Sequence, residues 1–181
     1  GLGDVYKRQE ANVGGTASAA RGLTIANTDG AVSVTGAIGA GSNGTLGALV
    51  IGTAEADGNT GNITLSNSIG SDSAAGAASI SIGNSRTGTL ALAGADYNST
   101  GSQMFESDDF DLSGTAITFT SANGGGTDTI DFLDGAGGQI ILADGSNLTI
   151  NSGGAAVTIK PSIGGTTGGT SEDVVINAGS G

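Results

Sequence analysis

The sequence contains no cysteine and no histidine, and it has only one proline and one methionine. Without thiols or imidazoles there is no thiol nucleophile, no histidine-based catalytic triad, and no zinc or haem site of the usual kinds. The lack of cysteine fits a bacterial surface protein as well as a cytosolic one, so it does not fix the compartment. From these absences we predict that the protein is not an enzyme and has no catalytic residues and no cofactor.

Basic residues are scarce as well. Five lysines and arginines stand against 17 aspartates and glutamates, which gives a formal net charge of −12. A chain of this charge is repelled by nucleic acids and by anionic membranes, so we predict neither as a partner. The apolar runs are much shorter than the roughly 18 residues that a membrane-spanning helix needs. We therefore expect no membrane insertion of this segment.

Glycine, in contrast, supplies 36 of the 181 residues, while aromatic residues make up 3%. A flexible linker can have such a composition, but its aliphatic residues would not be patterned. Here an apolar–small–apolar triplet returns repeatedly, and the triplets are separated by turn-rich runs of Gly, Asn, Asp and Ser. Period-two alternation between turn signals predicts short β-strands. The triplets lie at residues 23–25, 32–34, 63–65, 80–82, 90–92, 110–112, 117–119, 130–132, 140–142, 148–150, 157–159 and 174–176, with a less regular one within 46–51.

Each of these strands offers only two apolar side chains on one face, so the strands must stack on one another to bury a core. The triplet centres recur at spacings of 26 or 27 residues: Thr64, Ala91 and Thr118; Asp131 and Thr158; Thr24 and Val50; Thr149 and Val175. We therefore predict an all-β fold, a right-handed parallel β-helix (β-solenoid) with coils of about 27 residues. An antiparallel β-sandwich is the alternative, although its core would use more aromatic residues.

The first and third residues of the triplets are expected to face the interior and the middle residues to face outward. The predicted inward residues are Ile63, Leu65, Ile80, Ile82, Leu90, Leu92, Ile117, Phe119, Ile140, Leu142, Leu148, Ile150, Val157 and Ile159. The predicted outward residues are Thr64, Ser81, Thr118, Thr149 and Thr158.

The first nine residues, GLGDVYKRQ, differ from the rest of the chain and hold two of its five basic residues. The stretch from Asp4 to Gln9 resembles the translation of a sequencing adaptor that recurs in uncleaned metagenomic assemblies. Such segments are excluded from fold reasoning. We expect residues 1–9 to be non-native, and residues 10–181 to form a single solenoid array that is a fragment of a longer chain.

One stretch resembles a calcium motif. Residues 123–131 read NGGGTDTID, close to the calcium-binding nonapeptide repeat of β-helices, with Asn123 in place of the first glycine. Asp128 and Asp131 are the candidate ligands, since Ca²⁺ prefers carboxylate oxygens. In that architecture successive copies share each ion, and no second copy follows here. We therefore predict no metal site and expect folding to need no ion.

The densest acidic cluster comprises Glu106, Asp108, Asp109 and Asp111. Paired carboxylates can hydrolyse glycosidic bonds. The three basic residues beyond the first nine are isolated from this cluster in the sequence, and the middle position of Asp111 in its triplet predicts a solvated face. A carbohydrate-binding or carbohydrate-cleaving β-helix nevertheless stays open as the alternative function.

A sugar-binding face usually presents exposed aromatic residues. Phe110, Phe119 and Phe132 occupy triplet positions that we predict to be inside. Beyond the first nine residues, Tyr97 and Phe105 are therefore the only aromatic candidates for such a face.

Residues 89–120, which read TLALAGADYNSTGSQMFESDDFDLSGTAITFT, resemble the repeat unit of giant bacterial surface proteins, as do residues 62–92 and 144–181. These are the filamentous-haemagglutinin-like and autotransporter-adhesin-like β-strand repeat proteins. The resemblance implies a parallel β-helix that acts as a structural stalk or adhesin segment of a large secreted or surface-anchored protein. It also implies an extracellular or cell-surface location, and a host surface, a neighbouring cell or a glycan as partner. Uncapped end coils would in addition favour end-to-end self-association.

Overall fold

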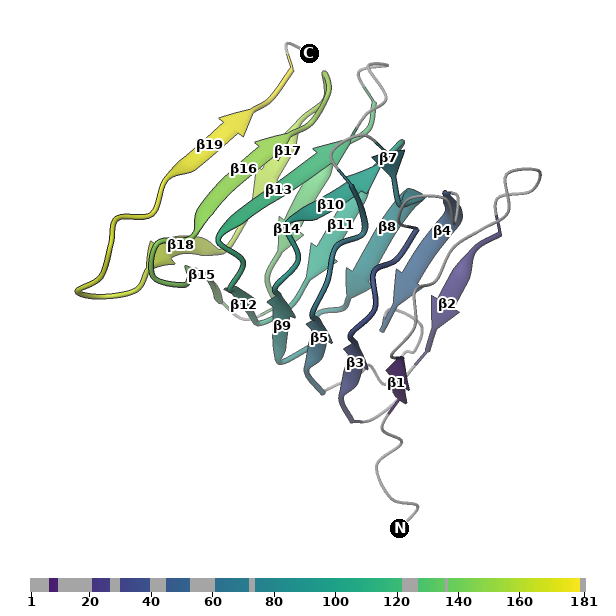
Figure 1. Cartoon of the computed structure of the whole chain (residues 1–181), viewed down its shortest axis with the longest axis horizontal. Coiled ribbons are helices and arrows are strands. Elements are labelled where there is room, and N and C mark those ends of the chain that lie inside the picture. The colour runs from purple at the N-terminus through teal and green to yellow at the C-terminus, as the bar shows by residue number, and fades with distance from the viewer. Residues whose placement is uncertain are drawn as a thin grey trace.

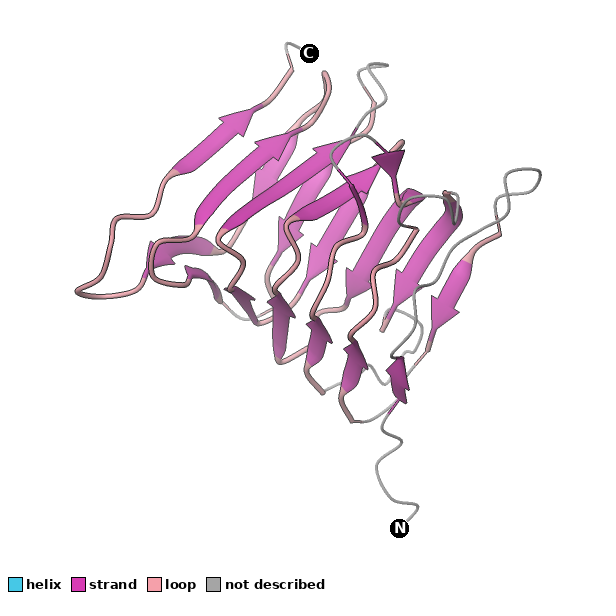
Figure 2. Cartoon of the chain, in the orientation of Figure 1, coloured by secondary structure: helices cyan, strands magenta, loops and turns pink. Residues whose placement is uncertain are grey.

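The computed structural model describes residues 7–9, 21–26, 30–39, 45–52, 61–71, 74–121, 127–135 and 137–179, and every regular element in these ranges is a β-strand (Figure 2). The strands are β1 (Lys7–Gln9), β2 (Leu23–Ile25), β3 (Val32–Val34), β4 (Leu46–Ile51), β5 (Ile63–Leu65), β6 (Gly70–Ser71), β7 (Ala74–Ala75), β8 (Ala77–Gly83), β9 (Thr89–Leu92), β10 (Asp96–Ser99), β11 (Gln103–Glu106), β12 (Asp109–Leu112), β13 (Ala116–Ser121), β14 (Ile130–Leu133), β15 (Gln139–Leu142), β16 (Asn147–Asn151), β17 (Val157–Ile159), β18 (Ser162–Gly165) and β19 (Val174–Asn177).

The strands stack into a parallel β-solenoid with three faces (Figure 1). Face 1 is the seven-stranded sheet β1-β3-β5-β9-β12-β15-β18. Faces 2 and 3 share a sheet that forks at β8, where Ala77 pairs with β10 and Ile80 begins the pairing with β11. Face 2 continues as β10-β13-β16-β19, and face 3 runs β2-β4-β8-β11-β14-β17. The predicted all-β solenoid is confirmed, and the sandwich alternative is wrong, because the one antiparallel pair among the described strands is β6 with β7.

Face 2 is less regular in the first coils, where no triplet marks it. In these coils Ile38 and Ile69 occupy the position of a face 2 strand. Single parallel bridges join Ile38 to Ile69 and Ile69 to Tyr97. Both isoleucines are fully buried. The triangular cross-section is therefore present in the first coils, with one bridging residue where the later coils have a strand of four or more residues.

Coil length varies around the predicted value. The successive partners on face 1 are Val32, Ile63, Leu90, Phe110, Ile140 and Ile163, which are 31, 27, 20, 30 and 23 residues apart. The predicted pairing of Thr64 with Ala91 is confirmed. The further step from Ala91 to Thr118 is wrong: Ala91 pairs with Asp111 on face 1, whereas Thr118 lies on face 2. Turns vary in length, so an equal spacing can join triplets of different faces.

The interior is built from aliphatic ladders that run through successive coils. All predicted inward residues are buried except Val157 and Ile159, which are half-buried at the last strand of face 3. The predicted outward residues are half-exposed, as alternation in a strand requires.

Five aromatic rings fill the middle of this core. Tyr97 stacks on Phe119 with ring centroids 4.8 Å apart, and Phe105 stacks on Phe132 at 5.3 Å. Phe119 contacts Phe105 and Phe132 edge-on at 5.1 and 5.0 Å, and Phe110 meets Phe132 at 5.6 Å. All five side chains are fully buried. This cluster links all three faces in the central coils.

Gly138 lies where the backbones of two successive coils approach each other closely. A Cβ added at Gly138 would lie 1.3 Å from the backbone oxygen of Asp108, whereas one added at Gly164 meets nothing within 4 Å. We expect Gly138→Ala to lower the free energy of unfolding by about 3 kcal/mol or more, because backbone must move to relieve the overlap. Gly164→Ala is the matched control, and we expect its urea midpoint to be unchanged or slightly raised. Equal midpoints for the two variants would contradict the packing described here.

The first and last described strands of face 3 are both incompletely covered: Leu23 and Ile25 in β2 are half-buried, as are Val157 and Ile159 in β17. In the last coil Ile163 and Ile176 are 38% and 45% exposed. End-to-end association through uncapped coils stays a prediction.

Part of the adaptor-like segment pairs with the solenoid. Lys7 pairs with Val32 and Gln9 with Val34, so β1 lies beside β3 on face 1. Tyr6 lies outside the described residues, as does the rest of residues 1–6. The adaptor origin of residues 1–9 stays a prediction.

Candidate functional site

The calcium candidates lie at the entry to β14. Residues 122–126, which include all three glycines of the motif, lie outside the described residues. Asp131 accepts a hydrogen bond from the Thr129 hydroxyl (Oγ1 to Oδ2, 2.6 Å), while Oδ2 of Asp128 is buried without a hydrogen-bond partner. Within the described ranges, no three acidic residues come close enough together to hold a metal ion. Asp128 and Asp131 therefore have no third carboxylate beside them there.

The second prediction follows from this geometry. We expect circular dichroism spectra and thermal unfolding curves to be the same with added Ca²⁺ and with a chelator. Two carboxylates give too few of the six to eight oxygen ligands that Ca²⁺ takes. A gain of strand signal on adding Ca²⁺, abolished in Asp128→Asn, would make these residues ligands.

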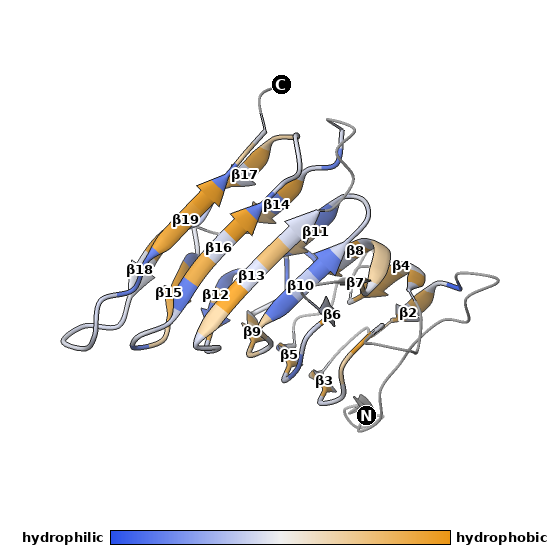
Figure 3. Cartoon of the chain, turned by 45° about the horizontal axis from the view of Figure 1, so that its top comes forward, coloured by the Kyte–Doolittle hydropathy of each residue, from blue (hydrophilic) through white to orange (hydrophobic). Residues whose placement is uncertain are grey.

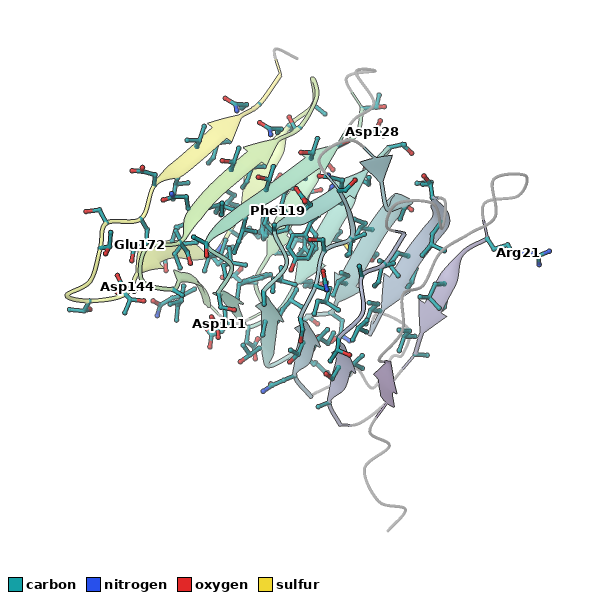
Figure 4. The ribbon with its side chains drawn as sticks, in the orientation of Figure 1. Arg21, Asp111, Phe119, Asp128, Asp144 and Glu172 are labelled. Carbon is teal, nitrogen blue, oxygen red and sulfur yellow. The ribbon has the colours of Figure 1, made fainter. Side chains whose placement is uncertain are left out.

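The acidic cluster is spread around the corner between face 3 and face 1. Glu106 ends β11 on face 3, Asp108 lies in the turn, and Asp109 and Asp111 lie on β12. The backbone N–H of Gln139 donates to Oδ1 of Asp109 at 3.1 Å, which ties two coils together. Asp111 is exposed, as predicted, on the outer side of face 1 (Figure 4). The contacts of Asp109 are thus those of a structural acceptor.

The expected sugar-binding aromatics are in the wrong place for that role. Tyr97 and Phe105 are both fully buried in the aromatic cluster, so the prediction that they could form an exposed sugar face is wrong. Burial raises the pKa of the Tyr97 phenol above its usual range, and the hydrogen bond from the Gly94 N–H opposes part of that rise. Phe110, Phe119 and Phe132 are buried, as predicted. No exposed aromatic ring is found within the described ranges.

The side-chain amide of Gln103 is buried at the corner between faces 2 and 3, which the sequence pattern did not predict. Gln103 pairs with Ile80 and Ile130, so it occupies a position on face 3 that an aliphatic residue fills in the neighbouring coils. It is fully buried, and its Nε2 donates to the backbone oxygens of Tyr97 and Thr120, each at 2.8 Å. The only available signal was the irregular triplet QMF, which breaks the apolar alternation.

The sequence pattern also did not reveal a set of side-chain hydrogen bonds that join successive coils. In each of them a side-chain oxygen accepts a hydrogen bond from a backbone N–H of the following coil. The pairs are Asn62 with Thr89, Ser68 with Asp96, Ser102 with Thr129, Asp109 with Gln139, Asp144 with Thr170, Asn147 with Asp173, and Ser152 with Gly179. The Asn, Asp and Ser residues of the turns therefore serve to join coils.

The described residues include no helix that is long and apolar enough to cross a membrane. Asp109, a candidate catalytic residue, thus accepts a hydrogen bond from the backbone of the next coil, and Asp131, a candidate metal ligand, accepts one from the hydroxyl of Thr129. No protein-family model, no curated protein and no solved structure matches this chain.

Proposed function

We propose that this chain is a structural stalk or adhesin segment of a large secreted or surface-anchored bacterial protein and performs no chemistry of its own. The observation that carries the proposal is the unbroken face 1, in which seven strands pair in parallel from β1 to β18. Each rung joins residues about one coil apart in the sequence, so force along the solenoid axis is shared among many backbone hydrogen bonds.

The surface supports the same role. Thr64, Thr118 and Thr149 face outward with short polar side chains, and the net charge of −12 favours solubility of a long rod. The proposed location is the bacterial cell surface or the extracellular space. The proposed partners are a host surface, a neighbouring cell or a glycan.

Single-molecule force spectroscopy with handles at the two termini tests the stalk role. We expect stepwise lengthening, with one step per coil of about 70–105 Å, because coils of 20–31 residues extend by about 3.4 Å per residue. Release of the whole length in a single low-force event would contradict a load-bearing rod.

The alternative, a carbohydrate-active β-helix, rests on the exposed carboxylates Asp109 and Asp111. A reducing-sugar assay and a glycan array on the purified chain distinguish the two functions. The stalk proposal predicts no hydrolysis, with or without Asp109→Asn. Hydrolysis that Asp109→Asn abolishes would overturn it, whereas glycan binding without turnover would make the segment an adhesive part of the stalk.

A further inference from the structure

Four stretches of the chain read Asn, then any residue except Pro, then Ser or Thr, which is the acceptor motif for N-linked sugars. They begin at Asn43, Asn62, Asn98 and Asn147. Asn43 lies outside the described residues. Asn62 and Asn147 are exposed, whereas Asn98 is only 7% exposed. The three described motifs therefore differ in their accessibility to an enzyme in the folded chain.

Asn62 and Asn147 occupy equivalent positions at the entry to a face. Asn62 lies directly before β5 on face 1, and Asn147 is the first residue of β16 on face 2. Each is followed by a buried inward residue, Ile63 or Leu148. Figure 3 shows the start of β16 as hydrophilic. The same local arrangement thus occurs twice, on two different faces.

The side-chain amides are held in the same way at both positions. Oδ1 of Asn62 accepts a hydrogen bond from the backbone N–H of Thr89 at 3.0 Å, and Oδ1 of Asn147 accepts one from the N–H of Asp173 at 2.9 Å. Among the described residues, the Nδ2 of neither asparagine has a hydrogen-bond partner. The amide oxygen therefore joins the side chain to the next coil, and the nitrogen is the group left for reaction.

The threonine of each motif lies on the same side of the strand as its asparagine. Side chains alternate along a strand, so residues two positions apart project together, with about 6.6 Å between them. Thr64 and Thr149 are half-exposed on the outer side of their strands. An enzyme that approaches from solvent therefore meets the amide nitrogen and the hydroxyl of the motif on one surface.

Asn98 has the opposite surroundings. Its Nδ2 donates to the backbone oxygen of Ser71 in β6, and its Oδ1 is buried. A sugar on this nitrogen would need space at a position that is already filled by protein. Asn98 therefore matches the motif in sequence but not in accessibility, and it serves as an internal control.

We infer that Asn62 and Asn147 are N-glycosylation sites of the folded chain and that Asn98 is not. The co-substrate is a glycosyl diphosphate, in which a diphosphate joins the sugar to a nucleotide or a polyprenol. Nδ2 attacks the anomeric carbon of the sugar, and the bond from this carbon to the diphosphate oxygen breaks. The diphosphate leaves with the bonding electrons, and one Nδ2 proton goes to a base of the transferase.

The modification is compatible with the contacts between coils. A sugar on Nδ2 leaves Oδ1 as an acceptor, so the hydrogen bonds from Thr89 and Asp173 are retained. Since both asparagines are exposed, the sugars add bulk and solubility to the surface and take no space in the core. The inference does not depend on the stalk role.

Mass spectrometry of peptides after enzymatic glycosylation tests the inference. The purified chain is incubated with UDP-glucose and a soluble asparagine glycosyltransferase that modifies short synthetic peptides of all three described motifs. We expect a hexose on Asn62 and on Asn147. We expect Asn98 to be modified at least about tenfold more slowly, because access to it requires local opening of the fold. Equal rates at the three residues would overturn the inference.

Thr64→Ala and Thr64→Ser are the matched variants. Thr64 is half-exposed on the outer side of β5, so we expect both variants to unfold at the urea midpoint of the parent chain. Alanine should abolish modification of Asn62 and leave that of Asn147 unchanged, whereas serine, which keeps the hydroxyl, should preserve both. Modification of Asn62 in the alanine variant would mean that the motif is not recognised, and would contradict the inference.

A second arm of the experiment distinguishes the two carriers of the sugar. Membranes that contain an oligosaccharyltransferase and a polyprenyl-diphosphate oligosaccharide replace the soluble enzyme and UDP-glucose, with the same peptides as reference substrates. Transfer to Asn62 and Asn147 in either arm supports the inference and identifies the carrier. If the peptides are modified but either asparagine of the folded chain is not modified in both arms, the inference is wrong.

Discussion

Ile150→Lys is expected to lower the free energy of unfolding by about 3–5 kcal/mol, because it places an uncompensated charge in the core. Ile150 is fully buried between Phe119 and Ile176 in the face 2 ladder. A loss of this size is a large part of the 5–15 kcal/mol that stabilises a typical domain. Urea denaturation followed by circular dichroism measures the change.

Thr149→Lys is the matched control for this variant. Thr149 is the neighbouring residue in β16, half-exposed on the outer side of face 2. We expect its free energy of unfolding to lie within about 0.5 kcal/mol of the parent chain. A control as destabilised as Ile150→Lys would mean that the assignment of inner and outer residues in β16 is wrong.

Phe119→Ala is the second change with a large expected effect. Phe119 contacts Tyr97, Phe105 and Phe132 at centroid distances of 4.8–5.1 Å. Truncation removes a buried ring and leaves a cavity among the remaining rings, which costs about 3–5 kcal/mol. The same urea measurement reports it.

Phe119→Leu separates the cost of the cavity from the cost of the lost aromatic contacts. Leucine keeps most of the buried volume and loses the aromatic contacts, so we expect it to cost no more than about 1.5 kcal/mol. If the alanine variant were no less stable than the leucine variant, the aromatic cluster would not be the packed centre of the core.

The strands and most of the inward residues could be predicted from the sequence, because period-two alternation reports directly which side of a strand is buried. Ile63, Leu65 and Ile150 are examples. The register could be predicted only where turns have similar lengths. Asp131 and Thr158 are true ladder partners, whereas Ala91 and Thr118, at the same spacing, lie on different faces.

The polar interior could not be predicted by the same means. Gln103 is buried because three acceptors happen to converge on its amide at a corner, and no local pattern encodes that convergence. The placement of Tyr97 and Phe105 also depended on the fork of the sheet at β8, which is a tertiary feature. The sequence identified Asp109 as a candidate site residue, but it did not predict that this carboxylate accepts a hydrogen bond from the backbone N–H of Gln139 in the next coil.

The most direct test of the stacked-coil account uses the absence of cysteine from the chain. Thr64→Cys with Ala91→Cys places two thiols on adjacent strands of face 1, where the strand spacing of about 4.8 Å suits a disulfide. Ala91→Cys with Thr118→Cys has the same sequence separation but joins residues of different faces. Under mild oxidation we expect an intramolecular disulfide in the first variant and free thiols in the second. A disulfide in the second variant and none in the first would contradict the stacked-coil arrangement.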